Sequence, residues 1–313
     1  MSRTLIQKTK KLLASELGTC YGTGGGLVSF ALAYPNTYYV GMSNLGFQTV
    51  YKILNELPEV VCERVFLPDW EDQKEYRRTN TKLFALESQR PVKDFDILGF
   101  SISYELDYLN ILKILDFSNI PLRSQERKET EPLIIAGGPC ATFNPEPLAD
   151  FIDAFVIGEA EEVLPEIIEV VKPARRTTIA GGSEKCKEKR EEILKALGQI
   201  EGVYVPSLYQ VEYNQDGTIK SIRPKNGAAP PRIKKRWVKN LDEFETHSVI
   251  LTPNTEFKNM FLIELTRGCR HLCRFCLAGY CYLPPRARSL ENILPLIDRG
   301  SELTNKIGLV GAA

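Results

Sequence analysis

Three closely spaced cysteines near the C-terminal end of the chain constrain its fold more than any other feature. Cys269, Cys273 and Cys276 lie within eight residues, in the run LIELTRGCRHLCRFCLAGYC that spans Leu262–Cys281. Their spacing, Cys-x₃-Cys-x₂-Cys, requires a fold that presents three thiols from one short loop. Disulfides, a zinc site and an iron–sulfur cluster are the three explanations of this pattern, and each implies a different kind of protein.

The N-terminus argues against the disulfide explanation. The run MSRTLIQKTKKLLASELG carries scattered lysines and no continuous apolar segment, so it lacks the pattern of a secretory signal peptide. No run of about 18 apolar residues occurs, so the sequence predicts no membrane-spanning helix. We therefore expect a cytoplasmic, reducing compartment, in which closely spaced cysteines more often bind metals or carry redox chemistry than form disulfides.

Zinc and iron–sulfur make different demands on the remaining ligands. A structural zinc site takes four protein ligands, usually as two separated pairs. The chain has one triplet and no second Cys-x₂-Cys pair, so a fourth ligand would have to be Cys281 or His271. A cubane held by three cysteines leaves one iron without a protein ligand, and that open position can bind a small chelating molecule. The spacing favours the cluster and leaves the zinc site open.

The triplet resembles the hallmark of the radical S-adenosylmethionine (radical SAM) superfamily, Cys-x₃-Cys-x-aromatic-Cys, with Phe275 as the aromatic residue. The resemblance implies a [4Fe-4S] cluster on the three cysteines, with S-adenosylmethionine chelated to the fourth iron and cleaved reductively to a 5′-deoxyadenosyl radical. It also implies a one-electron donor of the ferredoxin or flavodoxin type. Phe275, Gly308 and Gly311 are expected near the S-adenosylmethionine.

The segments around the triplet match the start of a radical SAM barrel. A strand-like FLIEL precedes the loop, and Ser289 is a plausible N-cap for a following helix. Apolar residues recur there at helical spacing, at Leu290, Ile293, Leu294 and Ile297. KIGLVGAA then predicts a strand, which completes a first βαβ unit within residues 256–313. The later barrel strands are absent, so we expect this chain to be the N-terminal part of a longer protein, with doubtful turnover of its own.

Residues 1–171 alternate strand-like and helix-like segments, which predicts an α/β domain with an open parallel sheet and flanking helices, of the Rossmann type. The predicted strands are 26–35, 60–68, 95–103, 132–139 and the beginning of 153–171. Such sheets bind ligands at the carboxyl ends of their strands. Gly137, Gly138, Gly158 and Glu159 follow two of these strands, and contact with a ligand and tight turns explain them equally well.

This domain resembles the cobalamin-binding-type domain that precedes many radical SAM domains, most closely in GGPCATFNPEPLADFIDAFVIGEAEE. The runs YPNTYYVGMSNLGFQTVY and ERVFLPD further resemble a subgroup of uncharacterised bacterial and archaeal radical SAM proteins. The Asp-x-His-x-x-Gly motif that ligates cobalt is missing, and the chain's two histidines, His247 and His271, lie outside the domain. Two options remain, cobalamin without a histidine ligand or a structural domain that holds no corrin, and we favour the second.

Residues 172–255 form a predicted connector, with a charged helix, a β-hairpin around Asp216–Gly217 and a Pro-rich linker. The linker's basic run PRIKKRW is expected to be a solvated face. Lysine plus arginine equals aspartate plus glutamate, at 40 each, so nucleic acid is not indicated as a partner. His247 is expected at the surface or as a cap, and GTGGG at 22–26 as a hinge loop.

Two other functions remain open beside the radical SAM enzyme. One is a zinc-binding interaction module with Cys281 or His271 as fourth ligand, and the other is an electron-transfer protein whose cluster has Cys281 as fourth ligand. Three arginines in the loop either offset the charge of a cluster or stay solvated, namely Arg267, Arg270 and Arg274. No motif identifies the substrate or a catalytic acid, base or nucleophile.

Overall fold

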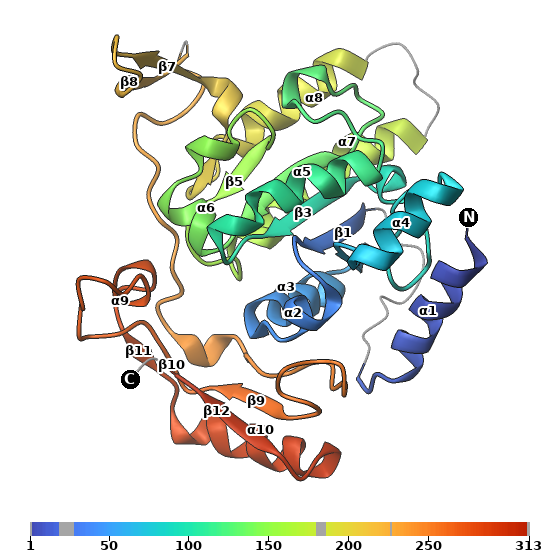
Figure 1. The fold of residues 1–313 in the computed structure, drawn as a ribbon. Helices are drawn as coiled ribbons and strands as arrows, with labels where there is room; N and C mark the ends of the chain where they lie inside the picture. The colour runs from blue at the N-terminus through green and yellow to red at the C-terminus, as the bar shows by residue number, and fades with distance from the viewer. Residues whose placement is uncertain (1, 19–27, 180–185, 226, 312–313) are drawn as a thin grey trace.

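The computed structural model describes residues 2–18, 28–179, 186–225 and 227–311, and the side chains of these residues outside 173–189. The predicted hinge at 22–26 lies outside the described residues. Two units are visible along the chain, an N-terminal α/β unit and a smaller C-terminal unit that contains the cysteine loop (Figure 1). In the described residues, no helix is both long and apolar enough to cross a membrane.

A six-stranded sheet organises the N-terminal unit. Its order is β2-β1-β3-β4-β5-β6, and the pairs from β2 to β5 are all parallel. The strands are β1 (Val28–Tyr34), β2 (Val60–Phe66), β3 (Ile97–Ser101), β4 (Leu133–Gly137), β5 (Ala154–Val156) and β6 (Val203–Tyr204). The predicted α/β fold with a mainly parallel sheet is confirmed. One edge of the sheet differs from the prediction. There, β6, which comes from the predicted connector, pairs antiparallel with β5.

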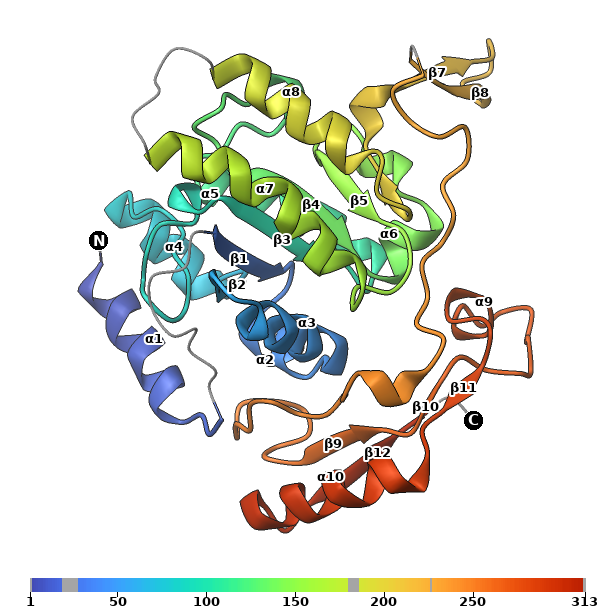
Figure 2. The same cartoon turned by 180° about the vertical axis from the view of Figure 1, so that it is seen from behind.

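Helices cover both faces of the sheet. Figures 1 and 2 show α5 on one face and α7, with α8 beside it, on the other. The helices of this unit are α1 (Arg3–Ala14), α2 (Tyr38–Met42), α3 (Leu45–Glu56), α4 (Trp70–Thr79), α5 (Tyr108–Phe117), α6 (Pro139–Phe143), α7 (Val163–Ile179) and α8 (Cys186–Leu197). The run 41–57 predicts one helix with Ser43 or Asn44 as its cap, and α3 confirms it, while the short helix α2 before the cap was not predicted. Asn44 caps α3, where its side chain accepts a hydrogen bond from Phe47 N at 2.9 Å.

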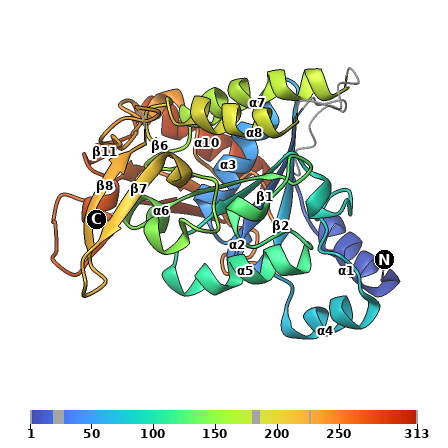
Figure 3. The same ribbon diagram turned by 90° about the horizontal axis from the view of Figure 1, so that it is seen from above.

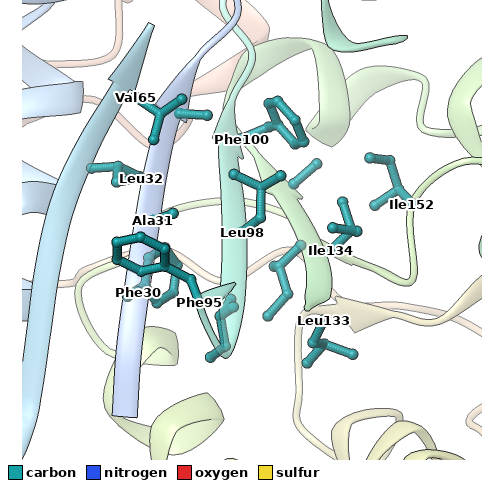
Figure 4. Packing of buried hydrophobic residues seen from close by; sticks show 14 of the residues in the cluster. Phe30, Ala31, Leu32, Val65, Phe95, Leu98, Phe100, Leu133, Ile134 and Ile152 are labelled. Atoms are coloured by element: carbon teal, nitrogen blue, oxygen red, sulfur yellow. The ribbon is translucent and has the colours of Figure 1, made fainter. Parts of the chain in front are cut away.

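The core fills the space between the sheet and these helices (Figure 4). Phe30 on β1, Leu98 on β3 and Ile134 on β4 are each at most 2% exposed. Gly99 makes room for the Phe30 ring, because a Cβ at this position would lie 2.5 Å from ring atoms. Burying one such large apolar side chain stabilises the fold by about 1.5–3 kcal/mol. The inner strands β4 and β5 read as continuous apolar runs because both faces of a parallel sheet are covered.

The C-terminal unit has the predicted strand, loop, helix and strand. β9 (Phe261–Glu264) pairs in parallel with β12 (Ile307–Val310), and α10 (Leu290–Leu303) connects them. Ser289 is the N-cap of α10, as predicted, and accepts a hydrogen bond from Asn292 N at 3.3 Å. A two-residue ladder joins β10 (Thr266–Arg267) to β11 (Arg286–Ala287), and α9 (Ala278–Cys281) lies between them in sequence.

His247 is packed inside this unit. Its segment lies against the free edge of β9, where Ser248 N donates to Leu262 O at 2.9 Å. The imidazole is 7% exposed and stacks on the Phe261 ring at 5.2 Å, and its Nδ1 lies 2.9 Å from Ser248 O. The prediction of a surface histidine is therefore wrong, because ring stacking and a backbone partner hold this residue inside.

The predicted hairpin is confirmed. β7 (Tyr209–Tyr213) and β8 (Ile219–Pro224) pair antiparallel, and Asp216 in the turn accepts a hydrogen bond from Thr218 N at 3.0 Å. The hairpin projects at one end of the molecule, at the edge of the sheet that carries β6 (Figure 3). Its turn residues are exposed, and its strands bury Tyr209 alone.

Candidate functional site

The three cysteines lie on one loop, residues 268–277, which we call the cluster loop. Gly268 opens it at φ +85°, where a Cβ would lie 2.3 Å from Tyr282 O, so glycine is required there. Inside the loop, Cys276 N donates to Cys273 O at 2.9 Å. At its end, the hydroxyl of Tyr280 donates to Leu272 O at 2.9 Å. The loop therefore begins at a fixed turn and closes on the helix α9.

The thiols of the cluster loop are accessible. Cys273 is exposed and Cys269 and Cys276 are half-buried, while Phe275 is 92% exposed. Thiolates are the ligand type that suits iron–sulfur clusters and zinc. Within the described part of the chain, no three Cys, His, Asp or Glu side chains form a group arranged to hold a metal ion. The donor set fits an iron–sulfur cluster by its chemistry, and ligation by these three residues remains a prediction.

Cys281 and His271, the two candidates for a fourth ligand, differ in their surroundings. Cys281 is 5% exposed in α9, and burial raises the pKa of its thiol to about 11. A raised pKa opposes the thiolate form that binds a metal. His271 is exposed on the loop. Burial of Cys281 thus weighs against both rival functions that use its thiolate.

A crevice of about 490 Å³ lies next to the cluster loop. It opens at the carboxyl ends of β1, β3, β4 and β5, where the chain order switches between β1 and β3. The C-terminal unit supplies its other wall, from Thr266, Arg267, Gly268, Tyr282 and Gly311. The residues that the sequence predicted for an N-terminal crevice all line it, namely Gly137, Gly138, Gly158 and Glu159. The structure thus joins these residues and Gly311 at one cavity.

Two of the three predicted glycines of the N-terminal unit are required by the backbone, and the third is not. Gly138 and Gly158 have φ values of +103° and +116°, and Cβ atoms there would lie 2.6 Å from Ile102 O and 2.0 Å from Arg236 O. Tight turns against neighbouring backbone explain both. Gly137 is not strained, and a Cβ there would meet only Val156 at an ordinary 3.7 Å. Protein packing does not require glycine at 137, so its missing side chain enlarges the crevice.

Gly308 and Phe275 lie away from the described lining of the crevice. A Cβ at Gly308 would lie 2.5 Å from Met260 Sδ, so the side chain of Met260 packs over this glycine within the C-terminal unit. Sequence analysis missed the polar group at the switch point. There, Asn44 Nδ2 donates to Ser103 Oγ at 3.2 Å, and Ser101 also lines the cavity. Its signal in the sequence is the pair of serines, Ser101 and Ser103, at the end of the predicted strand 95–103.

Six charged side chains join the two units beside the crevice, and we call them the junction. They are Glu159, Glu161, Glu264, Arg267, Arg286 and Arg288, and the exposed fraction of each side chain is at most 12%. Arg267 contacts all three carboxylates, with Nη1 2.9 Å from Glu159 and 2.7 Å from Glu161 and with Nε 2.9 Å from Glu264. Three positive and three negative groups give a neutral, nearly dry network.

The junction changes the ionisation of its members. Burial alone would raise the pKa of Glu159, but hydrogen bonding to Arg286 and the charge of Arg267 more than reverse this and lower that pKa. The pKa of Glu264 is lowered in the same way, against burial, by Arg267 and Arg288. Arg267 is therefore a buried ion-pair partner, whereas the predicted roles were an offset to a cluster or a solvated side chain. Arg270 and Arg274 are exposed.

The basic run of the connector also belongs to this region. Glu159 N donates to Arg236 O at 3.0 Å, and the Arg236 guanidinium pairs with Glu162 at 3.0 Å and Glu166 at 2.9 Å. Lys235 Nζ donates to the carbonyls of Cys281 and Leu283 at 3.0 and 2.9 Å. The prediction of a solvated face is wrong for these two residues, because carboxylates and carbonyl groups of both units bind them.

Comparison with known proteins shows which family the chain belongs to. Residues 46–206, just over half of its 313 residues, match the family described as "Radical SAM proteins, N-terminal". An uncharacterised protein of Methanocaldococcus jannaschii, MJ0966, is 27% identical over 285 residues, which cover 90% of this chain and 48% of the relative. The chain thus spans about half the length of the curated relative it matches.

A solved structure with 13% sequence identity aligns with a TM-score of 0.45, over 90% of this chain and 47% of that chain. It is the radical S-adenosylmethionine methyltransferase TsrM from Kitasatospora setae, with tryptophan substrate and a SAM analog bound. The family match over residues 46–206 covers strands β2 to β6 and most of the crevice residues of the N-terminal unit, those from Gly46 to Leu164. The chain therefore belongs to the radical SAM proteins that carry this N-terminal domain.

Proposed function

We propose that Cys269, Cys273 and Cys276 hold a [4Fe-4S] cluster whose fourth iron binds S-adenosylmethionine, and that the whole protein is a radical SAM enzyme. The observation that carries the proposal is the position of the triplet. The cluster loop begins at Gly268, a lining residue of the crevice, in a chain that belongs to the radical SAM proteins. When bound, such a cluster supplies the electron that breaks the sulfonium carbon–sulfur bond of S-adenosylmethionine.

The residues of this chain would bind and orient a molecule in the crevice, and they would exclude water from it. Tyr282 and Arg267 close one side of the crevice, and the apolar side chains of β1, β3 and α3 line its floor. Its volume of about 490 Å³ lies inside the range of about 300–1,000 Å³ typical of small-molecule sites. Gly137 adds space that packing does not use. We propose that the crevice holds the molecule on which the radical acts, or a second cofactor.

Cobalamin is the second cofactor that the resemblance suggests, and the residues fit it only in part. No histidine lines the crevice, so the chain supplies no imidazole ligand for cobalt there. The crevice has an apolar floor and a polar rim of Asn44, Ser101 and Ser103, which suits a group with an apolar face. The existence of a sizeable cavity favours a ligand site over the purely structural role that the sequence favoured.

The proposal also includes an electron donor and a cellular compartment. A one-electron donor of the ferredoxin or flavodoxin type would reduce the cluster, since the accessible cluster loop places its thiols at the surface. A cytoplasmic, reducing location suits three thiols that must stay unpaired to bind iron.

Anaerobic reconstitution with iron and sulfide tests the proposal. We expect a brown protein with about four iron and four sulfide per chain. Alanine at Cys269, Cys273 or Cys276 should abolish most of this loading. Alanine at Cys140 or Cys281, which are buried thiols outside the triplet, should leave it unchanged and serves as the matched control. A colourless protein with one zinc per chain would instead support the interaction module.

A further inference from the structure

The junction lies where the two units of the chain could otherwise move independently. Its carboxylates Glu159 and Glu161 belong to the turn after β5, in the N-terminal unit. Arg267 and Arg286 belong to β10 and β11, which flank the cluster loop on both sides. The contacts therefore run from the rim of the crevice to the two stems of the loop.

Glu159 is the centre of these contacts. Its Oε1 accepts a hydrogen bond from Arg286 Nη2 at 2.6 Å, and its Oε2 accepts from Arg267 Nη1 at 2.9 Å. The same Oε2 accepts from Val238 N, in the connector, at 2.9 Å. Arg286 also donates to Val238 O, so the connector backbone is bound through both its amide and its carbonyl. One carboxylate thus links three chain segments that are far apart in sequence.

Arg267 has the matching role on the loop side. It stands two residues before Cys269 and directly before Gly268, the turn that starts the cluster loop. Its guanidinium holds Glu159 and Glu161 of one unit and Glu264 of the other. A planar guanidinium presents donors in several fixed directions, which a lysine cannot do. The orientation of the loop stem relative to the crevice is therefore set by directed hydrogen bonds.

Stability alone gives little reason for such a network. Burying ion pairs removes charges from water, and this cost often equals or exceeds the attraction gained, so an apolar replacement can be as stable. What a buried network of paired charges supplies is a single geometry, since any other arrangement leaves a charge without a partner. Each of the six charges has an opposite partner, and among their buried side-chain polar atoms Arg288 Nε alone makes no hydrogen bond. The junction lines the crevice through Glu159, Glu161, Glu264 and Arg267, where geometry matters for a ligand.

We propose that Glu159 and Arg267 are positioning residues that hold the cluster loop in one orientation over the crevice. They would place S-adenosylmethionine, bound at the loop, opposite the molecule in the crevice without touching the reacting atoms. The inference rests on the proposed function, in which the loop carries the cluster. It extends that function, because it assigns the alignment of the two sites to a pair of residues that belong to different units.

The test uses Glu159→Gln and Arg267→Lys, which keep size or charge but break the directed hydrogen bonds. The matched controls are Asp150→Asn and Arg123→Lys, an exposed ion pair of the N-terminal unit at 2.7 Å. In the protein without metal, hydrogen exchange of residues 264–288 should speed up on the order of tenfold in both test variants, because breaking a buried pair favours local opening. The controls should match the wild type. The double variant should add little to either single change, since both disrupt one network.

After anaerobic reconstitution, iron and sulfide should bind to the test variants as to the wild type, because the three thiols are intact. The change that S-adenosylmethionine produces in the EPR spectrum of the reduced cluster should become weaker or heterogeneous in both. A purely structural role would not alter that signature in protein that has the wild-type melting temperature.

Unchanged exchange and an unchanged EPR response would overturn the inference, and so would complete loss of iron binding in a folded Arg267→Lys protein. If the wild type binds no cluster, the proposed function fails, while the exchange experiment still decides whether these residues hold the loop.

Discussion

At the scale of single residues, the histidine packed against β9 gives the clearest dependence on pH. His247 is buried, and desolvation lowers the pKa of its imidazole despite the opposing Ser248 carbonyl and the Glu245 carboxylate. The neutral form is therefore favoured in the folded protein. In the unfolded chain the pKa returns to about 6.5, so the unfolded state binds more protons than the folded state as the pH falls below that value.

Stability should accordingly fall between pH 7 and pH 5 and stop falling once the folded-state pKa is passed. Replacing the imidazole by Gln removes this titration, so His247→Gln should show a shallower loss of melting temperature over the same range. His271→Gln is the matched control, because His271 is exposed on the cluster loop. Equal slopes for the two variants would contradict the account.

The two glycines at the end of β4 should respond differently to alanine. Gly138 has φ +103° and no room for a Cβ, so Gly138→Ala should destabilise the protein by about 1–3 kcal/mol. Gly137 is unstrained and faces open space, so Gly137→Ala should stay within about 0.5 kcal/mol of the wild type. Urea unfolding measures both. A large loss at 137 would mean that its missing side chain serves packing instead of the crevice.

At the scale of secondary structure, the cap of α3 fixes both a helix and the rim of the crevice. Asn44 accepts from Phe47 N through its oxygen and donates to Ser103 Oγ through its nitrogen. Asn44→Asp keeps the cap and loses the donor, whereas Asn44→Ala loses both. We expect Asn44→Ala to cost about 0.5–2 kcal/mol in urea unfolding and Asn44→Asp clearly less. Equal losses would show that the contact with Ser103 matters more than the cap.

The elements that sequence analysis predicted well are those with a strong local pattern. The strand β4 reads as an uninterrupted apolar run, and Ser289 precedes a helical apolar face, so both were predictable. The helices α1 and α4 were not predicted, since only one residue of each is buried and charged residues make up more than half of α4. The start of α3 was predicted to within one residue, since Ser43 and Asn44 were both candidate caps, whereas α2 was not predicted because it has only five residues and no side-chain cap.

At the scale of the whole molecule, the contacts that join the two units were beyond prediction. Glu159 and Arg267 are 108 residues apart, and no local pattern pairs a particular carboxylate with a particular guanidinium at that separation. The basic run at 231–237 looked solvated because a charged run reads the same whether water or buried carboxylates satisfy it. The crevice residues of the N-terminal unit could be predicted because they follow the ends of strands. The wall that the C-terminal unit supplies could not be predicted, because it depends on where that unit contacts the sheet.

Limited proteolysis should reveal this docking in the intact chain. The hairpin is exposed and carries Lys220 and Arg223, whereas Lys235 and Arg236 are bound to groups of both units. Trypsin should therefore cut after Lys220 well before it cuts after Lys235 and Arg236, as followed by mass spectrometry, whereas Pro224 protects the bond after Arg223. Simultaneous cleavage at both places would mean that the connector does not hold the units together.

The central claim is that three thiolates bind a cluster and leave one iron open. The EPR spectrum of the reduced, reconstituted protein, recorded before and after addition of S-adenosylmethionine, tests it most directly. The account predicts a change in the spectrum on addition, and the same change in the Cys281→Ala variant. A spectrum that stays the same would mean that every iron already has a protein ligand, and would contradict the claim.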